Sequence, residues 1–235
     1  MKKTIFCIFT LFLTGSIASA GIPTQKVIPV THVFVPSGFD SNDNSEIILT
    51  GFLPNLCHKT PKANAMVTGN KIDILLTSLY YDESNPFCPE MVVPFTETLE
   101  LGVLDKGKYE ITVNGKSIYK KEAKLKINES SSAAIDDFSY AYVEHIDKES
   151  ARSGHVILKG YNPSDCFELD TIEYISNGKD TYSILPKMKQ VRSHCPMKLV
   201  PFEYEWKVPN DIDRNEVLLH VRTLEGRSRN TLFYR

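Results

Sequence analysis

The sequence lacks the features of several large functional classes. Its 27 Lys and Arg residues are balanced by 29 Asp and Glu residues, so the formal net charge is −2. The basic character of a nucleic-acid-binding domain is therefore missing. The chain also has no G-x-S-x-G, H-E-x-x-H, P-loop or G-x-G-x-x-G motif, the common signatures of hydrolases, zinc proteases and nucleotide-binding enzymes. We expect a non-enzymatic protein with no cofactor, no metal and no nucleic-acid partner.

Long apolar runs are also scarce, and the longest one lies at the N-terminus. Lys2 and Lys3 precede the apolar residues 4–13, and Ala18-Ser19-Ala20 has the A-x-A form of a cleavage site. A run of about ten residues is too short to span a membrane, which takes about 20. We predict that residues 1–20 are a cleaved secretory signal and that the product is periplasmic or secreted, with no transmembrane span after cleavage.

The rest of the chain repeats itself. Residues 47–57 and residues 156–166 both read as an apolar strand followed by Gly-aromatic-x-Pro-x-x-Cys, and Cys-Pro followed by Val-Pro-Phe occurs at residues 88–95 and again at 195–202. The repeat has a period of about 108 residues, which is the size of a small domain and longer than a solenoid repeat. The sequence thus predicts an internal duplication, with domains at residues 21–126 and 138–235 and a polar linker at residues 127–137.

Within each half, short runs rich in β-branched and aromatic residues alternate with turn residues, and no helical apolar stripe is present. Asn114-Gly115 and Asn177-Gly178 are typical hairpin turns. The pattern predicts an all-β protein made of two tandem antiparallel β-sandwiches. The expected strands are residues 30–35, 46–52, 71–81, 95–101 and 108–113, and then residues 139–144, 155–161, 171–175, 202–208 and 216–222.

Residues 101–115 contain the phrase Gly-x-Tyr-x-apolar-x-Val-Asn-Gly. This phrase is similar to the final hairpin of the immunoglobulin-like modules that occur in tandem in bacterial secreted and envelope proteins. The resemblance implies immunoglobulin-like β-sandwiches, and such modules mostly bind, space or scaffold.

Four cysteines follow the predicted signal, and a secreted chain is expected to oxidise them. In the repeat, Cys57 is equivalent to Cys166 and Cys88 to Cys195. Bridges Cys57–Cys88 and Cys166–Cys195 are the only pairing that leaves each domain self-contained. The alternative is a soft metal site that also uses His58, His194, Met91 and Met197. These residues are out of register between the copies, which favours disulfides.

Other candidate sites are weaker. The aromatic residues Tyr80, Tyr81 and Phe87 precede Cys88 and either cover the bridge or form a binding surface. Residues 40–46 begin like a calcium loop but lack its Gly and its final Glu, which favours a polar turn. The histidines at positions 32, 145, 155 and 220 are expected to be structural. The lysines of residues 116–126 and the arginines at positions 222, 227, 229 and 235 are expected to form solvated edges, with contact to an anionic envelope surface as the alternative.

These features predict a non-catalytic secreted or periplasmic binding or structural module whose partner is a protein or an envelope polymer. One alternative is a periplasmic pilus-type chaperone, which lends a strand edge to its subunit. Another is a secreted enzyme inhibitor that presents residues 82–86 to a protease.

Overall fold

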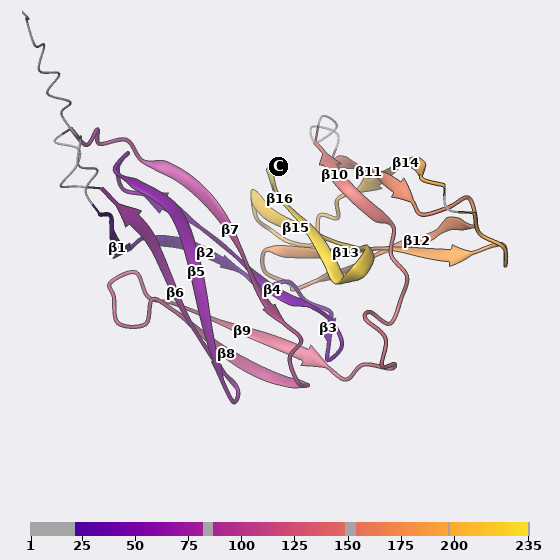
Figure 1. The fold of residues 1–235 in the computed structure, drawn as a ribbon, viewed down its shortest axis with the longest axis horizontal. Helices are drawn as coiled ribbons and strands as arrows, with labels where there is room; N and C mark the ends of the chain where they lie inside the picture. The colour runs from indigo at the N-terminus through magenta and orange to yellow at the C-terminus, as the bar shows by residue number, and fades with distance from the viewer. Residues whose placement is uncertain (1–21, 82–86, 149–153, 197, 235) are drawn as a thin grey trace, which may run out of the picture.

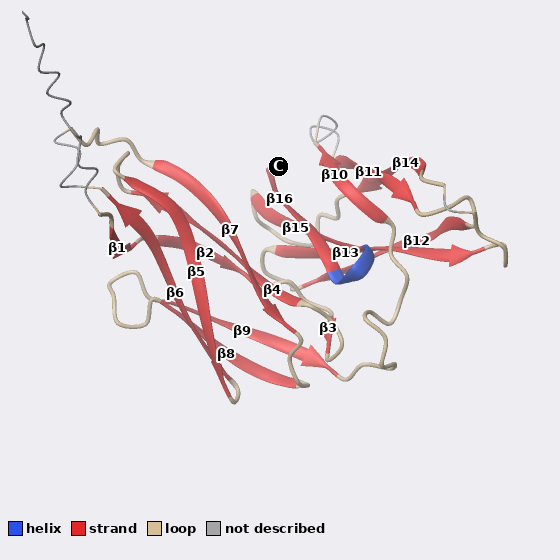
Figure 2. Cartoon of the chain, in the orientation of Figure 1, coloured by secondary structure: helices blue, strands red, loops and turns tan. Residues whose placement is uncertain are grey.

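A computed structural model describes residues 22–81, 87–148, 154–196 and 198–234 of the chain. Within these ranges the chain is built from strands and loops, and the 3-10 turn η2 (Leu224–Gly226) is the helical element (Figure 2). The predicted all-β fold class is confirmed. The predicted signal, residues 1–20, lies outside the described residues.

The first half of the chain forms two sheets that enclose one core. One sheet has the strand order β2-β4-β7, and the other has the order β1-β6-β8-β9-β3 with β5 also paired to β6. Apolar residues that alternate along the strands, such as Ile47, Leu49, Ile72 and Ile111, fill the space between the sheets. The strands are β1 (Thr24–Val27), β2 (Val30–Phe34), β3 (Phe39–Asp40), β4 (Ser45–Leu53), β5 (His58–Thr68), β6 (Lys71–Tyr80), β7 (Val93–Gly102), β8 (Gly107–Val113) and β9 (Lys121–Asn128).

The second half of the chain encloses a separate core between two further sheets, as Figure 1 shows. Their strand orders are β10-β11-β14 and β12-β13-β15-β16. Trp206, the only tryptophan of the chain, packs edge-on against Tyr182 in this core. The strands are β10 (Tyr142–Asp147), β11 (His155–Asn162), β12 (Phe167–Ser176), β13 (Thr181–Gln190), β14 (Val200–Lys207), β15 (Glu216–Thr223) and β16 (Arg227–Tyr234).

The two sandwiches share one strand plan. The order β2-β4-β7 corresponds to β10-β11-β14, and β5-β6-β8-β9 corresponds to β12-β13-β15-β16. In both, the central pair of the larger sheet is parallel, β6 with β8 and β13 with β15, while the neighbouring pairings are antiparallel. The common plan supports the internal duplication that the sequence predicts. The parallel pair departs from the immunoglobulin arrangement, whose two sheets are antiparallel.

A glycine at the same place in each copy allows two strands and an aromatic ring to approach closely. Gly51 of β4 lies opposite Phe95, and Gly160 of β11 lies opposite Phe202. A Cβ atom at Gly51 would lie 2.2 Å from the carbonyl oxygen of Pro29, and one at Gly160 would lie 1.9 Å from that of Tyr142. Both contacts are with backbone, which cannot move aside easily. This explains why the repeated sequence phrase keeps its glycine.

The sequence did not predict β5, β9, β13 or β16. β5, β9 and β16 are rich in polar residues, so the apolar alternation that marks a strand is weak in them. β13 lacks alternation for a different reason, because its first six residues are all buried. β9 continues to Asn128, two residues into the expected linker, because Ile127 is 3% exposed and packs in the first core.

We predict that Gly51→Ala and Gly160→Ala each lower the free energy of unfolding by about 1–3 kcal/mol, the usual cost of overpacking a core. Denaturant unfolding of the purified chain measures the change. Gly107→Ala is the matched control, because a Cβ atom there would meet nothing closer than 3.6 Å. Equal stabilities of the Gly51 and Gly107 variants would contradict this account.

Candidate functional site

The predicted cysteine pairs lie at one end of each sandwich. The structure joins Cys57 to Cys88 and Cys166 to Cys195, the two pairs expected from the repeat. Cys57 stands between β4 and β5, and Cys88 lies in the segment that leads into β7. Backbone hydrogen bonds reinforce the first bridge: Leu56 N donates to Pro89 O at 3.2 Å and Tyr81 N donates to Cys57 O at 3.1 Å. The segment 87–92 is therefore fastened to the end of the sandwich.

The aromatic residues predicted beside this bridge divide into two groups. Tyr80 and Tyr81 are half-buried, and the Tyr80 ring lies 4.7 Å from the ring of His58. His58 is itself buried, and its Nδ1 lies 2.6 Å from Ser78 Oγ. Burial, together with the nearby Lys26, lowers the pKa of His58, so the imidazole is neutral. Phe87 differs, because 75% of its surface is exposed.

Sequence reasoning missed the apolar neighbours of Phe87. Met91 and Val92 are 56% and 60% exposed, and Phe52, which pairs with Pro94 at the start of β7, is 40% exposed. We call Phe52, Phe87, Met91 and Val92 the apolar tip. The sequence pattern indicates Met91 only as a possible sulfur ligand, although the apolar residues 91–93 that follow Cys88-Pro89-Glu90 were an available signal. The loop 82–86, expected to act in an inhibitor, lies outside the described residues.

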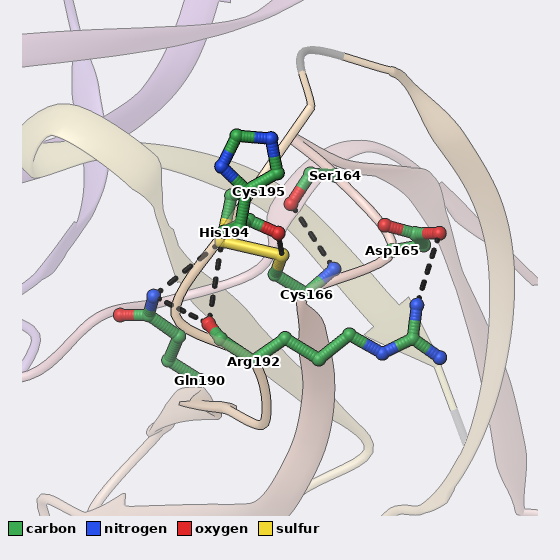
Figure 3. The surroundings of a disulfide bond; sticks show 7 residues. All are labelled: Ser164, Asp165, Cys166, Gln190, Arg192, His194 and Cys195. Carbon is green, nitrogen blue, oxygen red and sulfur yellow. Dashed lines mark hydrogen bonds and ion pairs between the residues drawn. A yellow bond between two sulfur atoms is a disulfide. The ribbon is translucent and has the colours of Figure 1, made fainter.

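The second bridge has polar surroundings (Figure 3). Cys166 N donates to Ser164 Oγ at 3.1 Å, and Gln190 Nε2 donates to Arg192 O at 2.7 Å. The Arg192 guanidinium lies 3.4 Å from the Asp165 carboxylate. The two sandwiches thus share their cysteine frame but present different chemistry around it.

The interface between the sandwiches accounts for several other candidate residues. In β15, Val217, Leu219 and Val221 point into the second core, while the alternate residue Leu218 packs with Phe34 and Ile48 of the first sandwich. Both faces of this strand are therefore buried. A strand that is covered on both faces typically has a continuous run of apolar residues in its sequence.

Arg222, which was expected to lie on a solvated edge, is instead buried at this interface, with 6% of its surface exposed. Its guanidinium pairs with both Asp43 and Asp136 and donates to the carbonyl oxygen of Gly38 at 3.3 Å. It also lies over the ring of Tyr140, 5.1 Å from the centroid. The expectation was wrong because the outward face of β15 is covered by the first sandwich.

The calcium-like residues serve the same interface. Asp43 Oδ2 accepts the N–H of Asp40 at 2.7 Å, which closes a tight turn, and Asn42 Nδ2 donates to Ala134 O of the linker at 2.7 Å. Within the described residues, no group of three or more His, Cys, Asp or Glu side chains is placed to hold a metal ion.

Two histidines pair with buried carboxylates across the interface. His220 Nδ1 lies 3.1 Å from Glu46 Oε1, and His32 Nε2 lies 2.8 Å from Asp180 Oδ2. Burial alone would raise the pKa of Glu46, but hydrogen bonds from His220 and its neighbours lower it below the ordinary value. Burial likewise opposes ionisation of Asp180, and hydrogen bonds led by that of His32 lower its pKa. Both carboxylates therefore act as anions in the folded chain.

Comparison with known proteins adds one similarity. Residues 47–125 match the family model of the ORF11 beta-sandwich domain. The matched segment runs from β4 into β9 and includes the first disulfide. This match supports a β-sandwich fold for the first half. It does not support the more specific resemblance to the immunoglobulin-like modules of secreted proteins. The search of curated proteins and the search of solved structures each found no match.

A hydrophobic helix of membrane-spanning length does not occur in the described part of the chain.

We predict that Arg222→Met lowers the free energy of unfolding by about 3–5 kcal/mol, because it leaves Asp43 and Asp136 buried without their cation. Arg227→Met is the matched control, since its side chain is 61% exposed. Denaturant titration of both variants measures the effect. The triple variant R222M/D43N/D136N should recover much of the loss, since it removes the uncompensated charges as well.

We also predict that Asp136 gives the stability a characteristic pH dependence. Burial, opposed by Arg222 and reinforced by Asp43, raises the pKa of Asp136 from 3.8 to about 6. A raised pKa means that the folded state favours the protonated carboxyl. The associated stabilisation is fully present below pH 3.8 and is lost as the pH rises through about 6.

The measurement is the unfolding free energy of the wild type minus that of Asp136→Asn at several pH values. This difference should increase as the pH falls from 7.5 to 5, because the asparagine does not titrate. A difference that is constant over this range would refute the assigned pKa shift.

Proposed function

We propose that this chain is a non-catalytic, secreted or periplasmic binding module that contacts a protein partner through the apolar tip. The observation that carries the proposal is the exposure of Phe87, Met91 and Val92 on a segment fastened by a disulfide. Apolar side chains held rigidly at a surface lose little conformational freedom on binding, and aromatic residues and Met are enriched in protein interfaces.

Two observations support the proposed compartment. Residues 1–20 have the sequence of a secretory signal, and the chain carries two disulfides, one in each sandwich. Disulfides persist in oxidising compartments such as the periplasm and the exterior of the cell. The short basic start Met1-Lys2-Lys3 favours a bacterial origin and hence the periplasm or the medium.

A non-catalytic role is supported by the contacts of three histidines, of which His58 and His220 are buried and His32 is half-buried. His58 contacts Ser78, His32 contacts Asp180, and His220 contacts Glu46. Each of these contacts joins neighbouring strands or the two sandwiches. These three histidines thus help to hold the structure together.

The interface gives this module its second property. Because Arg222 and the two histidine–carboxylate pairs connect the sandwiches, the apolar tip is held in a fixed direction relative to the second sandwich. A protein of this kind can position a bound partner as well as retain it.

The proposal is tested by photo-crosslinking in cells that produce the protein. A benzoylphenylalanine placed at position 87 or at position 91 should yield the same protease-sensitive adduct. Position 118 is the matched control, because Ile118 is 92% exposed on the loop between β8 and β9 of the same sandwich. Adding Val92→Asp should reduce the adduct formed from position 87. The absence of an adduct from the tip, or equal adducts from position 118, would rule out the apolar tip as the contact surface.

A further inference from the structure

A cleft lies beside the interface, between the edge of the first sandwich and a turn of the second. Its volume of about 440 Å³ is within the range of small-ligand sites, roughly 300–1,000 Å³. β9 and the connection from β2 to β3 form one wall, and the turn between β12 and β13 forms the other. The lining residues are Val33, Val35, Pro36, Ser37, Glu122, Ala123, Lys124, Lys126, Asn177, Lys179 and Asp180.

The cleft carries positive charge that the described residues do not neutralise. Lys124 and Lys126 flank the inward-facing Leu125 on β9, so both side chains leave the same outward face of the strand, at backbone positions about 7 Å apart. Lys179 approaches from the opposite wall. Within the described ranges, none of these three lysines forms an ion pair with a carboxylate.

The acidic residues of the cleft, by contrast, are already engaged. Glu122 lies 2.6 Å from the ammonium group of Lys120, and Asp180 lies 2.8 Å from His32. Asp180 is also buried, with 1% of its surface exposed. The three lysines therefore outnumber the two carboxylates of the cleft, of which one is paired with Lys120 and the other is buried.

The turn that carries Lys179 is held firmly against the first sandwich. Asn177 Oδ1 accepts the backbone N–H groups of Lys179 and Asp180, both at 2.9 Å, and Asn177 Nδ2 donates to Val35 O at 3.2 Å. A second contact joins Ser37 N to Ser183 Oγ at 3.2 Å. Lys179 thus keeps its position relative to the lysines of β9, and little ordering is needed when a ligand binds.

The remaining wall is apolar and narrow. Val33, Val35, Pro36 and Ala123 supply carbon surface next to the ammonium groups. A ligand that fits both parts has a compact carbon frame and an anionic group with more than one negative charge. Ammonium groups form strong charge-assisted hydrogen bonds with phosphate.

We propose that this cleft binds a phosphorylated sugar, either free or as the headgroup of an envelope glycolipid. The lysines bind the phosphate and the apolar wall packs against the sugar ring. The site lies between the sandwiches and shares no residue with the apolar tip, so the two proposals can fail separately.

Titration calorimetry with glucose 6-phosphate tests the free form of the ligand, with glucose as the uncharged control. The full-length mature protein should bind the phosphate ester and not glucose, and binding should weaken as salt is raised from 50 to 300 mM. In K124Q/K126Q/K179Q the affinity should fall about tenfold or more, which is the scale of one lost charged contact. The control K62Q/K108Q/K207Q removes three exposed lysines outside the cleft and should stay within about twofold of the wild type.

The glycolipid form is tested by flotation with phosphatidylcholine vesicles that contain lipid A, against phosphatidylcholine vesicles alone. Binding to lipid A vesicles that is lost in the cleft variant and kept in the control variant supports the headgroup as the source. Binding of glucose 6-phosphate with the same dependence supports the free sugar phosphate.

Three results overturn the proposal. The first is that neither probe binds, the second is that both triple variants lose binding equally, and the third is that inorganic phosphate binds as tightly as glucose 6-phosphate. Thermal unfolding of each variant verifies that it is folded, and the crosslinks from the apolar tip should be unchanged in the cleft variant.

Discussion

Removing the Arg222 guanidinium from water costs free energy that only well-placed acceptors offset. Those three acceptors come from two separate stretches of chain: Gly38 O and Asp43 in the first sandwich and Asp136 in the connecting segment. None of them belongs to the sandwich that carries Arg222. The cation is therefore satisfied only when the two sandwiches and the segment between them adopt this arrangement. The interface, the fixed direction of the apolar tip and the shape of the lysine cleft all depend on it.

Much of the fold could be predicted because it depends on local pattern. Strands with a strong apolar signal, such as the nearly continuous run of β4 and the alternation of β8, lie within a residue or two of the expected ranges. The cysteine pairs followed from the repeat, since equivalent positions in two copies restrict the choices. Gly51 and Gly160 were part of the repeated phrase, although the close contact with a neighbouring carbonyl is visible only in three dimensions.

The interface could not be predicted in the same way. Asp43 and Arg222 are far apart in the sequence, and each looks like an ordinary surface residue in its own segment. Asp43 stands in a polar turn that begins like a calcium loop, and Arg222 stands near other arginines at the C-terminus. The available signal was the nearly continuous apolar run at residues 217–221, which is typical of a strand that is covered on both faces. The candidate site could be predicted in part. The sequence marks the aromatic residues before Cys88 as a surface or a cover, but it suggests Met91 only as a metal ligand and gives no motif for Val92.

The two sandwiches use different sheets for the contact between them. The first sandwich uses its β2-β4-β7 sheet and the second uses its β12-β13-β15-β16 sheet, so unlike faces meet. Stacking of unlike faces leaves one face of each kind uncovered at the ends and, repeated, would build an open filament. The uncovered face of the first sandwich is mixed, because Met66 of β5 and Leu75 of β6 are 64% and 49% exposed while charged residues stand beside them. Glu110 of β8 stands where Leu218 stands in β15, and Lys159 of β11 is paired with Asp147. The first sandwich thus carries a charge on its uncovered face at the position where the second sandwich buries a leucine against its neighbour.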